Sequence, residues 1–174
     1  GGGMDIASMA DIRIASDTAR FAMNHIQIAR LSLDGGYYFF QRIVGPAKAL
    51  ELALSCRIFD AQEALTMGYV SRVHPQGELL ERTREFAREL AQGPAVSIQL
   101  FKRLIYRGLE TSLDTALTMA QQAMLVAQAT DDARTFFAEH RNELLWMAAV
   151  ALVIRPLVFG LHNLLTHQAI NPGL

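Results

Sequence analysis

The sequence predicts a mixed α/β fold that is rich in helices and holds only a few short strands. Residues 11–15 and 69–73 alternate between polar and apolar side chains, which is the period of a half-buried strand. From residue 78 onward only helical spacing of apolar residues appears. Strands this few do not close a sheet of their own, so we expect their partners in a preceding half of a longer protein.

The first third of the chain mixes both kinds of element. We predict a helix over residues 4–9, directly after three glycines, and strands over 11–15 and 19–23. Residues 24–36 show little periodicity and end in Asp34, Gly35 and Gly36, so they are predicted as a loop.

The next elements are separated by glycine and proline. An apolar helix over 37–44 stops at Gly45, and Pro46 suits the first position of a helix over 46–55. Asp60, with Glu63 three residues later, has the form of an N-terminal cap. It opens a short helix that ends at Gly68, and the strand over 69–73 follows.

Four helices are predicted in the remainder. The first, over 78–90, has one apolar stripe and glutamate–arginine pairs at helical spacing. Gly93 and Pro94 separate it from a helix over 96–108. Residues 111–114 form a cap before a helix that reaches residue 127, and residues 130–132 cap a helix that ends at His140.

Composition excludes several classes of protein. The 16 basic and 17 acidic residues give a net charge of −1, which leaves no basic footprint for nucleic acid. The chain is 51% hydrophobic and 19% charged, unlike a disordered protein. A single cysteine, Cys56, excludes an internal disulfide framework and a multi-cysteine metal cluster. It is compatible with a reducing compartment, and we expect a cytoplasmic location.

The two ends of the chain give their own expectations. The start carries neither a basic nor an apolar leader segment, and we expect an N-terminally truncated piece of a longer protein. Residues 144–165 are apolar and about long enough to cross a bilayer. Arg155 and Pro156 interrupt that run, so a membrane contact and a broken, buried or partner-docked helix both stay open.

Two candidate groups lie at the start of the chain. Gly1, Gly2 and Gly3 precede a helix, where free backbone N–H groups suit an anion or a developing oxyanion; a flexible linker is the alternative. Asp5 falls in the first turn of that helix, either as an acid/base group or as a carboxylate that favours the helix end.

Three further candidates follow in the loop. His25 is suited to proton transfer near neutral pH, although a lone histidine is often structural. Asp34 and Ser32 lie just before Gly35 and Gly36 and could equally form the turn there. The other histidines show no spacing typical of metal ligands, and no metal site is predicted.

Taken together, these segments resemble the enoyl-CoA hydratase/isomerase (crotonase) family over residues 1–141. The order and spacing of the segments carry the resemblance, and residues 60–70 are the most specific part. The matching segments are residues 1–5, 11–16, 19–21, 35–36, 42–45, 49–52, 60–65, 67–70, Lys102 and 130–134.

The resemblance implies the C-terminal portion of a crotonase-like (ClpP/crotonase) fold, followed by an apolar helical tail over 142–174. Family members polarise the carbonyl of an acyl-CoA thioester with two backbone N–H groups. Gly2 matches the second donor, flanked by Gly1 and Gly3 as substrate-binding positions, and the first donor would lie upstream of Gly1. No metal or redox cofactor is implied, and a homotrimer or hexamer is expected.

The sequence departs from a typical hydratase at both acid/base positions. Asp5 occupies the position of the first glutamate and His25 that of the second. The loop over 32–37 is closer to that of the dihydroxynaphthoyl-CoA synthase branch, in which Ser32 and Asp34 would face the substrate. Lys102 matches a region that lies near the CoA nucleotide, with a solvated helix lysine as the alternative.

The sequence therefore predicts enoyl-CoA hydration or double-bond migration through an enolate, with Gly2, Asp5, His25 and Asp34 as the catalytic group. Three alternatives stay open. They are a catalytically impaired paralogue, a ring-closing enzyme of the dihydroxynaphthoyl-CoA synthase kind, and a membrane-attached crotonase-like protein.

Overall fold

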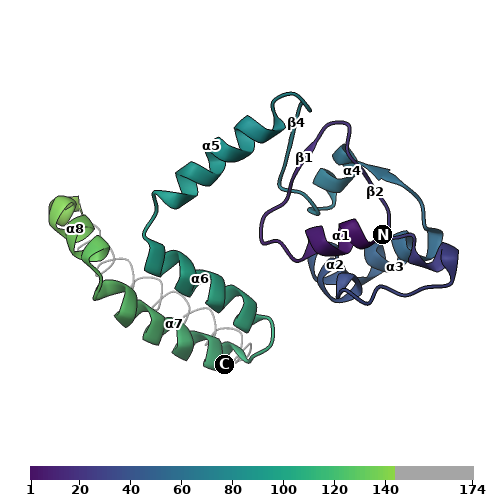
Figure 1. Ribbon diagram of the computed structural model, residues 1–174. Helices are drawn as coiled ribbons and strands as arrows, with labels where there is room; N and C mark the ends of the chain where they lie inside the picture. Colours follow the sequence, from purple (N-terminus) through teal and green to yellow (C-terminus); the bar gives the residue numbers. More distant parts are fainter. Residues whose placement is uncertain (144–174) are drawn as a thin grey trace, which may run out of the picture. The chain divides into compact units, whose positions relative to one another are not determined.

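The computed structural model of the protein describes residues 1–143, and the chain divides into two units between Gln92 and Gly93. Figure 1 shows helices and short strands in the first unit and helices alone among the described residues of the second.

The first unit contains all the strands of residues 1–143. Its elements are α1 (Gly2–Ser8), β1 (Ile14–Ser16), β2 (Arg20–Phe21), the 3₁₀ helix η1 (His25–Ile28), α2 (Gly36–Val44), α3 (Pro46–Ser55), β3 (Phe59–Asp60), α4 (Ala61–Thr66), β4 (Arg72–His74) and α5 (Leu79–Ala91).

The strands form two separate pairs. β1 and β4 are parallel, with Ile14 opposite Arg72 (Figure 1). β2 and β3 are antiparallel, with Phe21 opposite Phe59. Two-stranded sheets of this length have little stability of their own, so helix packing must hold the unit together.

The core of the first unit is built around Tyr69, which is fully buried. The rings of Phe21, Phe40 and Phe59 surround it, each with its centroid 5.4–6.3 Å from that of Tyr69. The Tyr69 hydroxyl donates to the Met4 carbonyl at 3.1 Å. Burial raises the pKa of the Tyr69 phenol above its usual value. Tyr69 thus fixes α1 against the rest of the core.

An ion-pair network joins α3 to α4 at the surface. Arg57 donates to Glu51 and to Glu63, and Asp60 caps α4 by accepting from the Glu63 N–H at 2.8 Å. Hydrogen bonds from Arg57 hold the pKa of the Glu63 carboxyl below its usual value. The predicted cap at Asp60 is confirmed.

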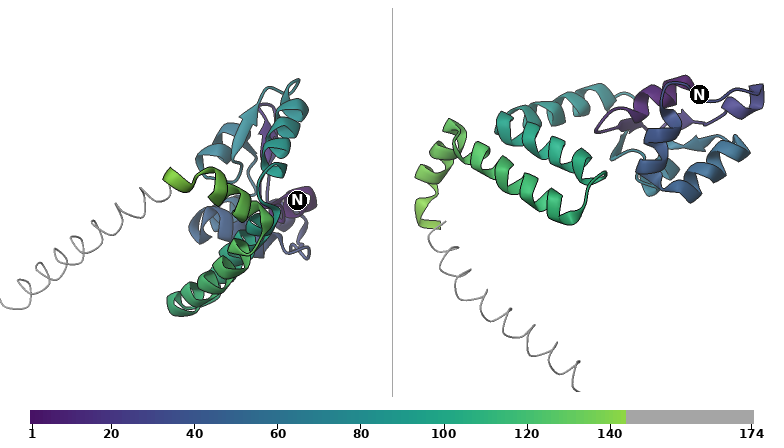
Figure 2. Two further views of the ribbon diagram at one scale, coloured as in Figure 1. Left: turned by 90° about the vertical axis from the view of Figure 1, so that its left-hand side faces the viewer. Right: turned by 90° about the horizontal axis from the view of Figure 1, so that it is seen from below.

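The second unit begins with α6 (Ala95–Gly108), α7 (Leu113–Gln128) and α8 (Asp131–Glu139). Figure 2 shows α6 and α7 lying side by side as a helical hairpin. Ser112 caps α7 and Thr130 caps α8 through side-chain oxygens, as the sequence predicts. The predicted helical tail at 142–174 falls almost wholly outside the described residues.

Several predicted boundaries are wrong. The helix predicted over 4–9 starts at Gly2, because backbone hydrogen bonds to the Gly1 carbonyl form the first turn. The strand predicted over 69–73 is found at Arg72–His74 instead. It starts later because Tyr69 and Val70 pack in the core as an irregular segment.

Other differences concern pairing. The strand predicted over 11–15 starts only at Ile14, where its partner β4 begins. The strand predicted over 19–23 is limited to Arg20–Phe21 by the length of β3, which the sequence did not indicate. The predicted loop over 24–36 contains η1.

Within residues 1–143, no helix is both long enough and apolar enough to cross a bilayer. The apolar run at 144–165 lies outside the described residues.

Candidate active site

Asp5 is the centre of the candidate site. It belongs to the first turn of α1, and its side chain is 0% exposed. The helix places it there because Met4 and Ser8, on the same face, pack against Tyr69; the Ser8 hydroxyl lies 3.2 Å from the Tyr69 hydroxyl. A buried carboxylate is costly unless it has hydrogen-bond partners, so its surroundings show what compensates it.

Two side chains from the following loop meet one oxygen of this carboxylate. The Ser32 hydroxyl donates to Asp5 Oδ2 at 2.8 Å, and His25 Nε2 lies 3.0 Å from the same atom. Asp5 Oδ1 has no hydrogen-bond partner among the described residues. The carboxylate is therefore held through Oδ2 alone.

Gly36 closes the other side of Asp5. A Cβ atom built on Gly36 would lie 1.9 Å from Asp5 Oδ1 and 2.8 Å from Ser32 Oγ. The Gly36 N–H donates to Ser32 Oγ at 3.1 Å, which orients the serine hydroxyl toward Asp5. Only glycine leaves room for the carboxylate at this helix start, and Gly35 before it adopts a positive φ of 79°.

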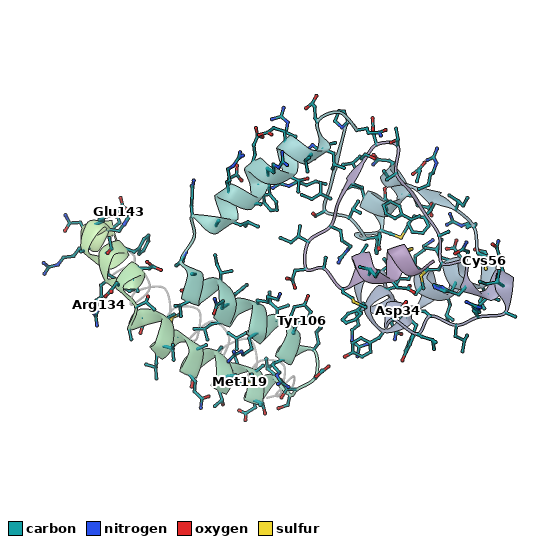
Figure 3. The ribbon with its side chains drawn as sticks, in the orientation of Figure 1. Asp34, Cys56, Tyr106, Met119, Arg134 and Glu143 are labelled. Carbon is teal, nitrogen blue, oxygen red and sulfur yellow. The ribbon has the colours of Figure 1, made fainter. Side chains whose placement is uncertain are left out.

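Gly2 and Asp34 lie next to each other beside this cluster. Gly2 and Gly3 are exposed first-turn residues of α1, where backbone N–H groups have no partner within the helix. A Cβ atom built on Gly2 would lie 3.9 Å from Asp34 Oδ2. Asp34 is exposed and lies where α1 and α2 come together (Figure 3).

The structure places every predicted site residue except Lys102 in the first unit. Asp5, His25 and Ser32 are in direct contact, and Gly2 lies beside Asp34. Gly1 lies beside Asn24, and its backbone nitrogen donates to the Ala22 carbonyl. Lys102 belongs to α6 in the second unit.

The sequence does not predict the role of Gly36. Its predicted place is the end of a loop, yet it begins α2 and borders Asp5. Two adjacent glycines at a helix start were the available signal, since one is enough to form a turn. The hydrogen bond from the Ser32 hydroxyl to Asp5 is likewise not predicted by the sequence.

The surface that follows the cluster is apolar. Large hydrophobic side chains are exposed along residues 26–37, of which Leu33 is 91% exposed. Within residues 1–143, no group of three or more His, Cys, Asp or Glu side chains is placed so that it could hold a metal ion. The cluster combines a buried carboxylate, an imidazole and a hydroxyl, which are groups that can hold and exchange protons.

Comparison with known proteins gives consistent matches. The family model described as "Enoyl-CoA hydratase/isomerase" matches residues 1–145. A probable enoyl-CoA hydratase of Mycobacterium bovis is 38% identical over 132 residues, which cover 76% of this chain and 51% of the relative. A short-chain-enoyl-CoA hydratase of Clostridium acetobutylicum is 35% identical over 145 residues, covering 82% of this chain and 56% of the relative.

Solved structures show the same fold. An enoyl-CoA hydratase from Bacillus anthracis matches with a TM-score of 0.76 and 31% identity, covering 82% of this chain and 55% of that one. An enoyl-CoA hydratase/isomerase from Cupriavidus metallidurans matches with a TM-score of 0.74 and 32% identity, over 77% and 51%.

These matches decide the family and the fold class. The chain spans about half the length of the curated relatives it matches. The predicted helix-rich, crotonase-like α/β fold is confirmed, as is the predicted family. By its matching segments, its family model and its fold, the chain belongs to the enoyl-CoA hydratase/isomerase family.

Proposed function

We propose that this chain forms part of an enzyme that hydrates a 2-enoyl-CoA thioester, or moves its double bond, through an enolate. The observation that carries the proposal is the buried Asp5 carboxylate, held by His25 and Ser32 beside the glycine-rich start of α1. The named activities of the relatives, several of them enoyl-CoA or crotonyl-CoA hydratases, support it.

The chemistry needs a group that stabilises negative charge on the thioester oxygen. We propose the Gly2 N–H as one donor, because fixed backbone dipoles stabilise a developing oxyanion by several kcal/mol. The family resemblance implies a second donor from a segment that precedes Gly1. Gly1 and Gly3 keep the backbone near Gly2 free of side chains.

The chemistry also needs groups that move protons at Cα and Cβ. Asp5 and His25 are in contact and form the proposed acid/base pair, and Asp34 next to Gly2 is a third candidate. Hydration and double-bond migration are both redox-neutral, so proton transfer and carbonyl polarisation suffice for them. We therefore propose that the reaction needs no cofactor apart from the CoA of its substrate.

One alternative is ring closure of the dihydroxynaphthoyl-CoA synthase kind. The resemblance to that branch implies that Ser32 faces the substrate. The Ser32 hydroxyl donates to Asp5, so this contact does not support ring closure. The turnover assay described below distinguishes an active enzyme from the alternative of a catalytically impaired paralogue.

Binding and assembly are proposed with the same function. The apolar residues exposed along 26–37 suit the acyl group of a CoA thioester, and Lys102 is proposed for the CoA end. Helices α6–α8 expose large apolar side chains such as Phe101 and Leu125, which supports the proposed homotrimer or hexamer. Light scattering of the purified protein checks that assembly, and the proposed cytoplasmic location is checked by cell fractionation.

The test is turnover of crotonyl-CoA by the protein expressed from its complete gene. We expect Asp5→Ala to lower kcat by about 100-fold or more, because the proton-transfer system loses its carboxylate. Asp114→Ala is the matched control, since Asp114 is an exposed aspartate in the first turn of α7. Absence of turnover by the wild type, or equal turnover by Asp5→Ala, contradicts the proposal.

A further inference from the structure

The two members of the proposed acid/base pair differ in access to a ligand. The Asp5 side chain is 0% exposed, and its free oxygen is covered by Gly36. The His25 side chain is 17% exposed, so of the two it is the one that solvent can reach. A substrate that reaches this cluster therefore meets the imidazole before the carboxylate.

We propose that His25 is the catalytic residue that exchanges protons with the substrate, and that Asp5 and Ser32 are positioning residues behind it. This assignment rests on the proposed function and gives the two members of the proposed acid/base pair different roles. It departs from a pair of carboxylates that both face the substrate.

The contact with Asp5 distinguishes the two ring nitrogens of His25. Nε2 lies 3.0 Å from Asp5 Oδ2, a distance at which a protonated ring forms an ion pair with the carboxylate. We therefore place the proton exchange with the substrate at the other ring nitrogen, Nδ1. The buried carboxylate stabilises the imidazolium that results, which is the role of the aspartate in a hydrolase triad.

Ser32 completes the arrangement by fixing Asp5. Its hydroxyl donates to Oδ2, and the Gly36 N–H donates to its oxygen, so the carboxylate is oriented from the start of α2. Since Oδ1 has no partner within residues 1–143, the two contacts at Oδ2 are what compensates the buried carboxylate. Loss of Ser32 is therefore expected to disturb His25 through Asp5.

The proton balance closes on this single base. In hydration, Nδ1 takes a proton from water while the water oxygen bonds to Cβ. The electron pair of the Cα–Cβ double bond then forms a double bond between Cα and the thioester carbon, and the carbonyl electron pair moves to the thioester oxygen. The enolate then collapses and takes the same proton from Nδ1 at Cα. The product gains one H and one OH, and His25 returns to its starting state.

The test compares variants in kcat and KM separately, again with the protein expressed from its complete gene. We expect His25→Ala to lower kcat about 10²- to 10⁴-fold with KM within a few-fold, and added imidazole to restore part of the loss. Asp5→Asn is expected to lower kcat without rescue by imidazole, because the ring is present but misoriented. His140→Ala, at the histidine that ends α8 in the second unit, is the matched control.

A second variant covers the case in which His25→Ala does not fold. His25→Gln keeps a side-chain N–H group that can donate to Asp5 but has no basic nitrogen, and we expect it to abolish turnover. Activity retained by this variant, or by His25→Ala, overturns the assignment while leaving the proposed function intact. A wild-type protein without turnover refutes the proposed function, and the assignment falls with it.

Discussion

Gly36→Ala tests the geometry of the site most directly. The added methyl group would lie 1.9 Å from Asp5 Oδ1 and 2.3 Å from Asp5 Cγ, whereas real Cβ atoms stay beyond 3.0 Å. Asp5 is fully buried on a helix packed against Tyr69, so it has no open space in which to retreat. Either the carboxylate or the start of α2 must move by about 1 Å.

The sign of the stability change separates this contact from backbone effects. Replacing glycine by alanine where the backbone allows it stabilises a protein by about 0.4–1 kcal/mol through the unfolded state. Gly36 has no positive φ, so that gain applies to it. Insertion of a methyl group into a packed site costs about 1–3 kcal/mol. We therefore expect a net loss of about 1–2 kcal/mol in the free energy of unfolding.

The effect on turnover should be larger than the effect on stability. A displacement of about 1 Å of a group that positions the catalytic side chain costs about 100-fold in rate, so we expect kcat/KM to fall by about that factor. Urea denaturation and crotonyl-CoA turnover measure the two effects. Gly108→Ala is the matched control, because Gly108 ends α6 and a Cβ atom there meets nothing within 4 Å. Wild-type stability and activity in Gly36→Ala would refute the described contact between Gly36 and Asp5.

Two further predictions concern stability. Tyr69→Phe removes a buried hydrogen bond to the Met4 carbonyl and should lower the free energy of unfolding by about 1–2 kcal/mol in urea denaturation, whereas an unchanged midpoint would contradict that bond. The pKa of Glu63 is lowered in the folded state, so its contribution to stability is present above its usual value of 4.5 and is lost as pH falls below it. Glu63→Gln should flatten the fall of Tm in that acid range relative to the wild type, and identical acid profiles would exclude a role for the Arg57 contact.

The local elements of the fold were largely predictable from the sequence. Pro46 and Asp60 mark the starts of α3 and α4 through backbone and capping chemistry that acts within a few residues. The short strands were placed less well, because β1 and β4 owe their limits to each other across more than fifty residues of chain. The start of α1 at Gly2 was missed because glycines disfavour helices in isolation.

The candidate site shows the same division. The residue types at Asp5 and His25 suggested acid/base chemistry, whereas the order and spacing of other segments, residues 60–70 above all, carried the resemblance to the family. The contacts of His25 and Ser32 with Asp5 Oδ2 come from the packing of α1 against α2 and the loop between them. The same packing makes Asp5 more buried than His25. Spacing along a chain cannot specify these, because the loop could take many paths between the same two helices.

The sequence by itself determined the family, the succession of helices and the set of chemical groups available, since each depends on residue type and near neighbours. Tertiary structure alone decided that Gly36 borders Asp5, that Ser32 donates to this carboxylate and that His25 is the more exposed partner. The physical reason is burial: the cost of placing a carboxylate away from water selects one arrangement of donors around it.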